Sequence, residues 1–275
     1  NGTKVLIDSF DSTDPNYSSN GLYVASKRPA KGDIATNSGL INSLSSGNAK
    51  IYGNVATGPG GTVGIGPGGA VGDKSWIDGG NTGIKPGWYT DDMNVSIPDV
   101  KPPFTGGSFT PVGGSGYQYI LSASANYEVA SVTGSILVKS NAHAVLLVDG
   151  NIAIAGSDKI EIEKGGSLQL YVVGATATLG GKGMVNNNGS ATNFYYWGLP
   201  GNAALTISGN GVFNGVIYAP SAALTLNGGG TTEGITGSSV TGSTTINGDF
   251  DFHYDESLAY GPYHRGYIVT SWNEI

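Results

Sequence analysis

One short segment has residue types and spacing suited to chemistry: Asp249-Phe250-Asp251-Phe252-His253-Tyr254-Asp255. On a β-strand its alternation places three aspartates and one histidine on one face, with neighbours about 6.5–7 Å apart, and the aromatic rings on the other. Carboxylates at that separation suit an inverting glycosidase, in which a water fits between acid and base. With the histidine they also suit a hard or borderline cation.

The simpler interpretation of this segment is an end strand with its aromatic face on the core and its acidic face in water. Such alternation is ordinary for a half-buried strand, and acidic residues on an exposed edge block end-to-end pairing. We favour this interpretation and predict no catalytic residue. Asp249, Asp251, His253 and Asp255 are kept as candidates for a surface site.

A second polar group is the oxygen-rich loop that carries Asp8, Asp11, Asp14 and Asn16. Calcium takes six to eight oxygen ligands, but this spacing does not fit an EF-hand loop. Asx turns explain the composition, so we expect no cofactor. Calcium-stabilised adhesion is the alternative, and a melting temperature measured with and without chelator would test it.

Aromatic residues gather at 194–197 and, near the end, at Tyr260, Tyr263, Tyr267 and Trp272. Exposed rings of this kind stack on sugars, whereas the commoner use is to pack over an open end of a repeat structure. We expect the packing role. A flat threonine ladder of the kind that binds ice is not indicated, because Thr176-x-Thr178 stands alone.

The elements that position these residues are indicated by glycine, which accounts for 47 of the 275 residues. Glycines and Asn-Gly pairs separate β-prone runs of four to six residues, such as 135–138, 144–148 and 159–163. Strand and turn alternate with gaps too short for a helix, which indicates an all-β chain. In the last of these runs, Ile160 and Ile162 share one face and the charged residues share the other.

We predict a right-handed parallel β-helix, a single-stranded solenoid in which each coil supplies backbone partners to the next. Turns recur every eight to ten residues, and the inward residues are small and branched. We expect one domain over residues 1–275, with a long Pro/Gly-rich excursion and an aromatic C-terminal cap. Its expected parts are an N-terminal cap and loop (1–34), first rungs (35–73), an irregular excursion (74–116), the main solenoid (117–258) and a tail strand (259–275).

The composition excludes several classes of function. The formal net charge is −7 and there is no run of Lys or Arg, so nucleic acid and anionic membranes are poor partners. The absence of cysteine removes disulfides, thiolate metal sites and cysteine nucleophiles. No 18-residue apolar run exists to span a membrane. The chain begins without a basic and apolar leader, so we expect either a processed or truncated product or an export signal elsewhere.

The C-terminal half resembles a family of bacterial surface proteins found in PilX-like pilus-assembly components, similar in style to the bactofilin β-helix. The residues that carry the resemblance are Phe194-Tyr195-Tyr196-Trp197-Gly198-Leu199-Pro200, residues 213–220, residues 248–258 and the terminal Ser271-Trp272-Asn273-Glu274-Ile275. The resemblance implies an exported right-handed β-helix and supplies no catalytic residues. Such relatives carry an N-terminal membrane or pilin-like segment that this sequence does not show.

We therefore expect a secreted or cell-surface structural or adhesive protein, pilus-associated and without catalytic activity. Its expected partners are other surface or pilus proteins, or glycans. The alternative is a carbohydrate-active β-helix, a lyase or hydrolase, or a glycan-binding module. The discriminating observation is whether Lys182, Arg265 and the aspartates of 249–255 line one groove.

Overall fold

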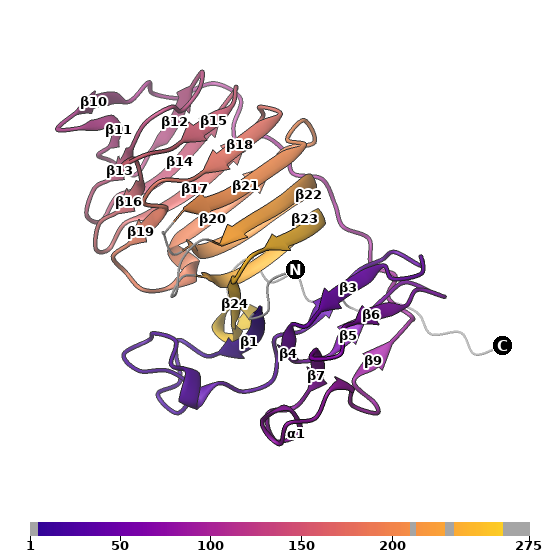
Figure 1. The fold of residues 1–275 in the computed structure, drawn as a ribbon. Coiled ribbons are helices and arrows are strands. Elements are labelled where there is room, and N and C mark those ends of the chain that lie inside the picture. Colours follow the sequence, from indigo (N-terminus) through magenta and orange to yellow (C-terminus); the bar gives the residue numbers. More distant parts are fainter. Residues whose placement is uncertain (1–4, 210–212, 229–233, 261–275) are drawn as a thin grey trace.

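The computed structural model describes residues 5–209, 213–228 and 234–260. They are all-β with about 6% helix, and their parallel strands stack as a β-solenoid of about nine turns (Figure 1). The solenoid predicted from the glycine spacing is therefore confirmed. Residues 261–275, which hold most of the expected tail strand and aromatic cap, lie outside the described residues.

Residues 117–255, here called the C-terminal turns, wind around three faces. The first face carries, in spatial order, β12 (Asn126–Val129), β14 (His143–Val148), β17 (Ser167–Val172), β20 (Phe194–Gly198), the first halves of β22 (Phe213–Gly228) and β23 (Gly234–Asn247), and β24 (Asp251–Asp255). The second face carries β15 (Ile152–Ile154), β18 (Thr176–Leu179), β21 (Ala204–Gly209) and the second halves of β22 and β23. The third face carries β11 (Tyr117–Leu121), β13 (Ile136–Val138), β16 (Ile160–Ile162) and β19 (Met184–Asn186), and β10 (Val112–Gly114) pairs antiparallel with β11.

Residues 5–90, here called the N-terminal turns, repeat this arrangement. Their strands are β1 (Leu6–Phe10), β4 (Lys50–Tyr52), β7 (Ala70–Gly72) and β8 (Gly83–Ile84) on the first face, β2 (Ile34–Ala35), β5 (Val55–Ala56) and β9 (Tyr89–Thr90) in a second sheet, and β3 (Leu44–Gly47) and β6 (Val63–Ile65) in a third. The helices are short: α1 (Lys74–Asp78), with 3-10 turns η1 (Ala25–Lys27), η2 (Ala191–Asn193) and η3 (Glu256–Tyr260). Asp73 begins α1, since its side chain accepts a hydrogen bond from the Trp76 amide at 2.8 Å.

The order of the turns in space differs from their order in the sequence. On the first face β24, the last strand of the described residues, pairs with β1, the first of them, and β1 pairs in turn with β4. The N-terminal turns therefore extend the solenoid beyond the C-terminal turns (Figure 1). The expectation that residues 1–34 form a cap was wrong for β1, because both of its edges carry a paired strand and a cap would leave one edge free.

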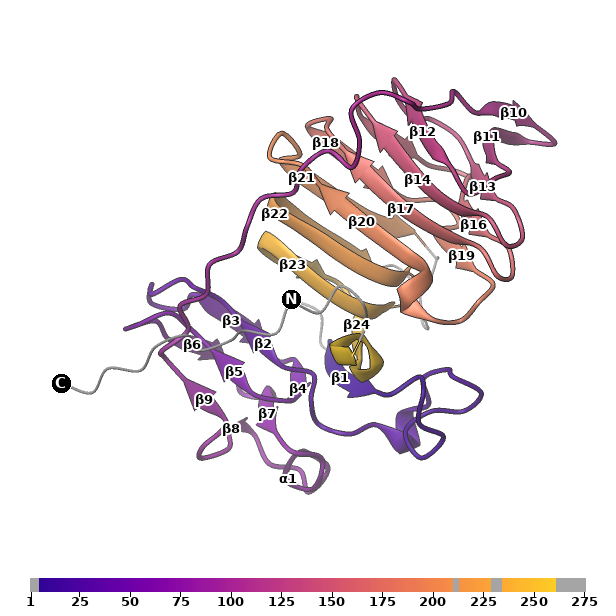
Figure 2. The same ribbon diagram turned by 180° about the vertical axis from the view of Figure 1, so that it is seen from behind.

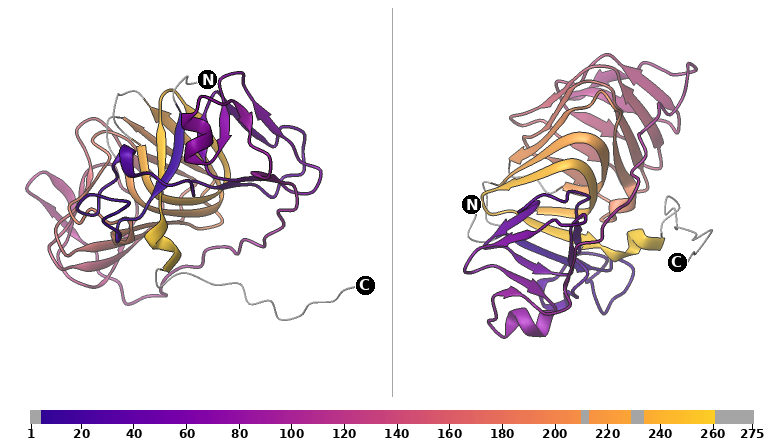
Figure 3. Two further views of the ribbon diagram at one scale, coloured as in Figure 1. Left: turned by 90° about the horizontal axis from the view of Figure 1, so that it is seen from below. Right: turned by 90° about the vertical axis from the view of Figure 1, so that its right-hand side faces the viewer.

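The expected irregular excursion, residues 74–116, also needs correction at both ends. β8 pairs with β7 and β9 pairs with β5, so residues 83–90 form part of a further turn. At the other end β10 and β11 form a hairpin. What remains is residues 91–108, here called the strap, which runs outside the coils from β9 toward β10 (Figures 2 and 3).

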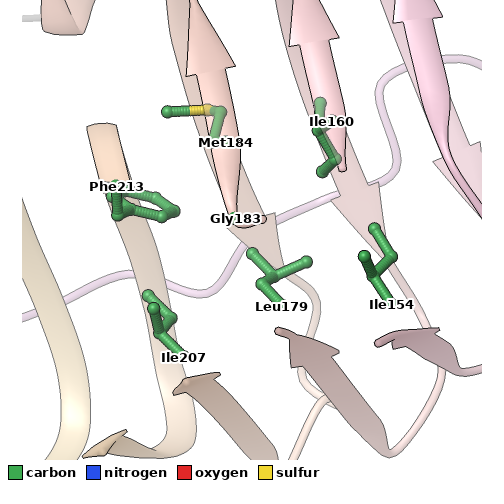
Figure 4. Close-up of a pocket in the computed structure, with 7 residues that line it drawn as sticks. All are labelled: Ile154, Ile160, Leu179, Gly183, Met184, Ile207 and Phe213. Atoms are coloured by element: carbon green, nitrogen blue, oxygen red, sulfur yellow. The ribbon is translucent and has the colours of Figure 1, made fainter. Parts of the chain in front are cut away.

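The core of the C-terminal turns is a column of aliphatic side chains inside the coil. Ile136, Leu146, Ile162 and Leu170 are all fully buried within it. This column contains a gap of about 10 Å³. Met184 and Phe213 are among the residues that line it (Figure 4). Because the walls are apolar and the gap is barely the size of one water, it stays dry.

Glycine is required where one turn stacks backbone against backbone on the next. A Cβ atom on Gly174 would lie 2.1 Å from the carbonyl oxygen of Gly150 in the preceding turn. No real side chain fits that distance, so this corner of the coil accepts only glycine. Glycine is thus needed in this chain for close stacking of the backbone between coils as well as for turns.

Candidate functional site

The acidic strand predicted from the sequence is β24, and it lies at the junction between the two sets of turns. β24 pairs in parallel with β1 over five residues, which places His253 beside Asp8 and Asp255 beside Phe10. We call this junction, from residues 5–31 to residues 251–257, the seam. Two segments that the sequence analysis treated separately, the acidic strand and the aspartate-bearing N-terminal segment, therefore form one site.

The centre of the seam is a bonded trio of Asp8, His253 and Tyr23. Asp8 is fully buried, and its two carboxylate oxygens bind the Nδ1 of His253 and the hydroxyl of Tyr23, each at 2.6 Å. A carboxylate only accepts, so the His253 Nδ1 carries the hydrogen. The rings of Tyr23 and His253 stack with centroids 3.6 Å apart. Burial raises the pKa of the Tyr23 hydroxyl, and the charge of Asp8 raises it further.

The two aspartates of β24 that flank His253 bind the backbone of the N-terminal segment. Asp251 Oδ1 accepts a hydrogen bond from the Leu6 amide at 3.1 Å. Burial raises the pKa of Asp251, although the neighbouring His253 acts in the opposite direction. Asp255 Oδ1 accepts from the amides of Ser12 and Ser257, each at 3.1 Å. Within the described residues its second oxygen, Oδ2, is buried without a hydrogen-bond partner.

The fourth predicted residue, Asp249, does not belong to this group. It lies exposed in the turn before β24 begins at Asp251. The structure therefore unites Asp251, His253 and Asp255 and leaves Asp249 aside. The interpretation of an end strand with an acidic face in water was wrong, because β1 covers the edge of β24 and Tyr23 covers His253.

Three further seam residues had no signal in the sequence analysis. Glu256, which is 8% exposed, accepts from the Ser9 hydroxyl at 2.9 Å and from Lys31 Nζ at 2.5 Å. The glutamate raises the pKa of Lys31. Ser9 and Lys31 look unremarkable in their local sequence, and their partner is more than 200 residues away, so no local pattern could have found them.

The oxygen-rich loop, for which calcium was the alternative, contains the expected Asx turns. Asp11 accepts from the amide and hydroxyl of Thr13, at 2.9 and 2.6 Å, and Asp14 accepts from the amide and side chain of Asn16, at 2.8 and 2.9 Å. In residues 5–209, 213–228 and 234–260, no group of three or more His, Asp or Glu is placed to hold a metal ion. Asp8 belongs to β1 rather than to this loop.

A polar hollow of about 260 Å³ opens beside the seam. It is lined by Asp11, Tyr17, Lys31, Asp33, Tyr254, Glu256, Ala259 and Tyr260. Its walls combine carboxylates with tyrosine rings, and Tyr260 is 87% exposed. Burial, with the nearby Glu256 and Asp255 carboxylates, raises the pKa of Tyr254. Such a surface can accept hydroxyl hydrogen bonds and stack against an apolar ring face.

The aromatic run 194–197 lies in β20, in the middle of the C-terminal turns. Phe194 and Tyr196 point into the core and are fully buried, and the Tyr196 hydroxyl donates to Asn202 at 2.9 Å. Tyr195 and Trp197 stack on the outer face with ring centroids 5.7 Å apart. The rings thus alternate between the inner and outer faces, and the expected place over a solenoid end was wrong for this run. Tyr263, Tyr267 and Trp272 lie outside the described residues.

The residues named as discriminators for an enzyme do not gather in one groove. Lys182 is exposed in the turn between β18 and β19. On the first face, β20, β22 and β23 separate that coil from β24, where Asp251 lies. Arg265 falls outside the described residues. In the part of the chain that the structure describes, His253 of β24 thus meets Asp8 and Tyr23. The aspartates of β24 bind backbone amides, on a coil apart from that of Lys182.

The fold and the seam define a parallel β-solenoid whose last strand is continued by its own N-terminal turns. Residues 126–260 match the model of a family described only as a domain of unknown function (DUF7305). The match begins with β12 and ends with η3, so the N-terminal turns lie outside it. No curated protein and no solved structure matches the chain. In the described residues, no helix is long and apolar enough to cross a membrane.

Proposed function

We propose that this chain is a secreted or cell-surface structural protein of bacteria, with an adhesive role beside a pilus-like apparatus and without catalytic activity. The observation that carries the proposal is the use made of the acidic strand. Asp251, His253 and Asp255 bind Leu6, Asp8 and Ser12 across the seam. Side chains that could have served a reaction centre instead bind the N-terminal turns to β24.

The architecture supports a mechanical role. In a solenoid each coil is bonded only to its neighbours, and stability grows with the number of coils. The strands of the first face form one ladder of eleven, from β12 to β8, that crosses the seam without a break. At about 4.8 Å per step this ladder is about 48 Å long. Such a rod holds whatever it displays at a fixed distance from its base.

Two measurements test the proposal. Fractionation of the producing cells, with an antibody against the chain, is expected to place it in the surface or secreted fraction. A screen of polysaccharides with purified protein is expected to show no turnover. Turnover that Asp251→Asn abolishes, while Asp249→Asn at the exposed position leaves it intact, would contradict the non-catalytic part. Recovery only from the cytoplasmic fraction would contradict the surface part.

A second candidate function is glycan binding at the polar hollow, with carbohydrate cleavage as its catalytic form. The hollow favours it because Asp11 and Asp33 offer acceptors beside the rings of Tyr17 and Tyr254. A glycan array is the test, with Tyr17→Ala as the variant and Tyr89→Ala, a tyrosine outside the hollow, as the control. Binding that Tyr17→Ala reduces tenfold or more supports the site. Binding that both variants leave unchanged removes it.

A further inference from the structure

The second face of the C-terminal turns carries a column of threonines that the sequence does not reveal. Parallel pairing aligns four of them on successive coils: Thr178, Thr206, Thr225 and Thr245. Their side chains point outward, because the residues that flank the first three in each strand are buried in the core. In the sequence Thr176-x-Thr178 stands alone, because the intervals between the four threonines are unequal. The register therefore corrects the expectation that the chain has no threonine ladder.

The columns on either side of these threonines hold only small or uncharged residues. In register they are Thr176, Ala204, Ala223 and Ser243 on one side, and Ser208, Asn227 and Asn247 on the other. We call these seven residues and the four threonines the threonine face. The strands that carry it, β18, β21 and the second halves of β22 and β23, lie side by side in Figure 1. The third face of the same turns differs, since it carries the ion pair of Lys159 with Glu161. The threonine face is thus an uncharged surface on a chain of formal net charge −7.

The four hydroxyls of the threonine column have no hydrogen-bond partner within residues 5–209, 213–228 and 234–260. Polar side chains nearby that stabilise the fold do have one. Asn247 Nδ2 donates to Asn227 Oδ1 at 3.0 Å, and the Thr241 hydroxyl donates to the Ser243 carbonyl at 3.2 Å. Threonine pairs on neighbouring strands stabilise a sheet when their hydroxyls bond to each other, which these do not. The column is therefore left to bind water or a ligand outside the chain.

The threonine face holds its hydroxyls at fixed positions. Leu205, Leu224 and Leu226 are buried beneath it and fix the backbone of its coils. Threonine is β-branched, so its side chain has restricted rotation about χ1. Neighbouring positions on a column are about 4.8 Å apart, and neighbouring positions along a strand on the same face are about 6.5–7 Å apart. Water molecules bound to this face therefore lie on a regular two-dimensional lattice.

The strap leaves the threonine face open. It is held on the first face, where the Tyr218 hydroxyl donates to the Pro98 carbonyl at 2.7 Å and Phe109 pairs beside β12. On the threonine face itself, Thr176 and Ser243 are exposed. A flat ligand can therefore approach the second face without moving another part of the described chain.

We propose that the threonine face binds ice. Oxygen rows on the surface of ice have repeats close to the two spacings of the face, so the waters that the hydroxyls hold continue the crystal lattice. The methyl groups between the hydroxyls restrict the orientation of the neighbouring water, and no charge is present to order a hydration shell that conflicts with the lattice. The inference names what the proposed adhesive role would attach to. It rests on that role only for its biological setting, since ice binding is a property of the purified chain.

A protein or a sugar fits the threonine face less well than ice does. Four coils of three positions each cover about 400 Å², whereas a stable protein interface takes about 800 Å² from each partner. Ice needs less area, because a growing crystal encloses a protein that stays on its surface only briefly. Sugars stack on aromatic rings, and the rings of Tyr171 and Trp197 lie on the first face instead.

Uptake into growing ice tests the proposal. Ice is grown slowly on a cold probe from a solution of the purified chain, and the protein in the ice is compared with that left in the liquid. We expect the wild-type chain to be enriched in the ice. Thr206→Lys places a bulky charge at the centre of the face and should lower the ice fraction about tenfold or more. Thr105→Lys, the same change at an exposed threonine of the strap, is the matched control and should behave as wild type.

A second variant guards against a folding defect in the first. Ser243→Lys lies at the exposed border of the face and should also lower the ice fraction, with a melting temperature by circular dichroism equal to that of wild type. If Thr206→Lys melts early, Ser243→Lys decides the test.

Three outcomes would overturn the inference. The first is a wild-type chain that stays in the liquid. The second is equal uptake of wild type and the folded face variants. The third is sedimentation with crystalline cellulose or chitin that the face variants abolish, without uptake into ice, which would assign the face to a sugar lattice. The cell fractionation described above can fail independently, because it measures only where the chain resides.

Discussion

Loss of the Asp8 carboxylate should loosen the seam while it leaves the C-terminal turns folded. Asp8→Ala removes the acceptor of two donors, the Tyr23 hydroxyl and His253 Nδ1, which it binds at 2.6 Å each. A buried donor left without its partner costs about 1–3 kcal/mol, so two cost about 2–6 kcal/mol. The His253 side chain keeps 12% exposure, which lets water reach it, and the lower end of that range is expected.

Hydrogen exchange followed by mass spectrometry is the suitable assay, because it reports separately on the two sets of turns, whose buried clusters meet at the seam through Ile246 and Phe252. In Asp8→Ala, peptides of β4 and β7 should exchange about thirtyfold faster, or more, than in the wild type. This factor corresponds to a loss of about 2 kcal/mol in the free energy of opening. Peptides of β14 and β17 should be unaffected. Asp8→Asn keeps one acceptor oxygen and should show about half of the effect.

The matched control is Asp92→Ala, an exposed aspartate in the strap, which should change stability by less than about 0.5 kcal/mol. Two results would refute the reasoning. One is equal exchange in Asp8→Ala and Asp92→Ala. The other is a uniform increase across both sets of turns, which would mean that the two cores unfold as one unit.

Three further predictions concern burial, packing and backbone contact. Burial raises the pKa of Asp251 in the folded state, so the ionised carboxylate opposes folding. The protonated form stabilises the seam at low pH, and this stabilisation is lost as the pH rises through the folded-state pKa. Asp251→Asn keeps an acceptor for Leu6 and should melt higher than wild type at pH 7, with a gap that closes below about pH 4; a gap that widens on acidification would reverse the sign. Phe213→Ala beside the core gap should cost about 3–5 kcal/mol in urea unfolding, against less than about 0.5 kcal/mol for Val112→Ala, 77% exposed. Gly174→Ala should prevent normal folding, as measured by circular dichroism. Gly114→Ala should be tolerated, because a Cβ atom there would lie 3.6 Å from its nearest neighbour. Equal behaviour of the two variants would argue against the stacked corner.

Local patterns in the sequence were sufficient for the strands and their faces. Ile160 and Ile162 point inward and Glu161 outward, as their alternation predicted, because the side-chain period of a strand is set by the backbone alone. In the run 194–197 the rings alternate between the two faces for the same reason. The place of that run in the rod was missed, since alternation carries no information on which coil a strand occupies.

The site itself could not be predicted, for a different physical reason. Asp8 and His253 are 245 residues apart, and their contact depends on which strand edge β1 pairs with, which no local pattern encodes. The strands β8 and β9 have two residues each, too few for any periodicity to be visible. Both errors in the expected boundaries, at residues 1–34 and at residues 74–116, come from this limit.

The pairing of β1 with β24 has a consequence for biosynthesis. The ribosome completes residues 5–90 before it reaches β24, the strand that pairs with β1 and ends at Asp255. At about 5–20 residues per second the early segment waits about 8–33 s before β24 exists. Over this interval β1 lacks its partner β24, and the apolar cluster of the N-terminal turns lacks its contacts with Ile246 and Phe252. The segment therefore stays within reach of chaperones and of any export machinery that accepts unfolded chains.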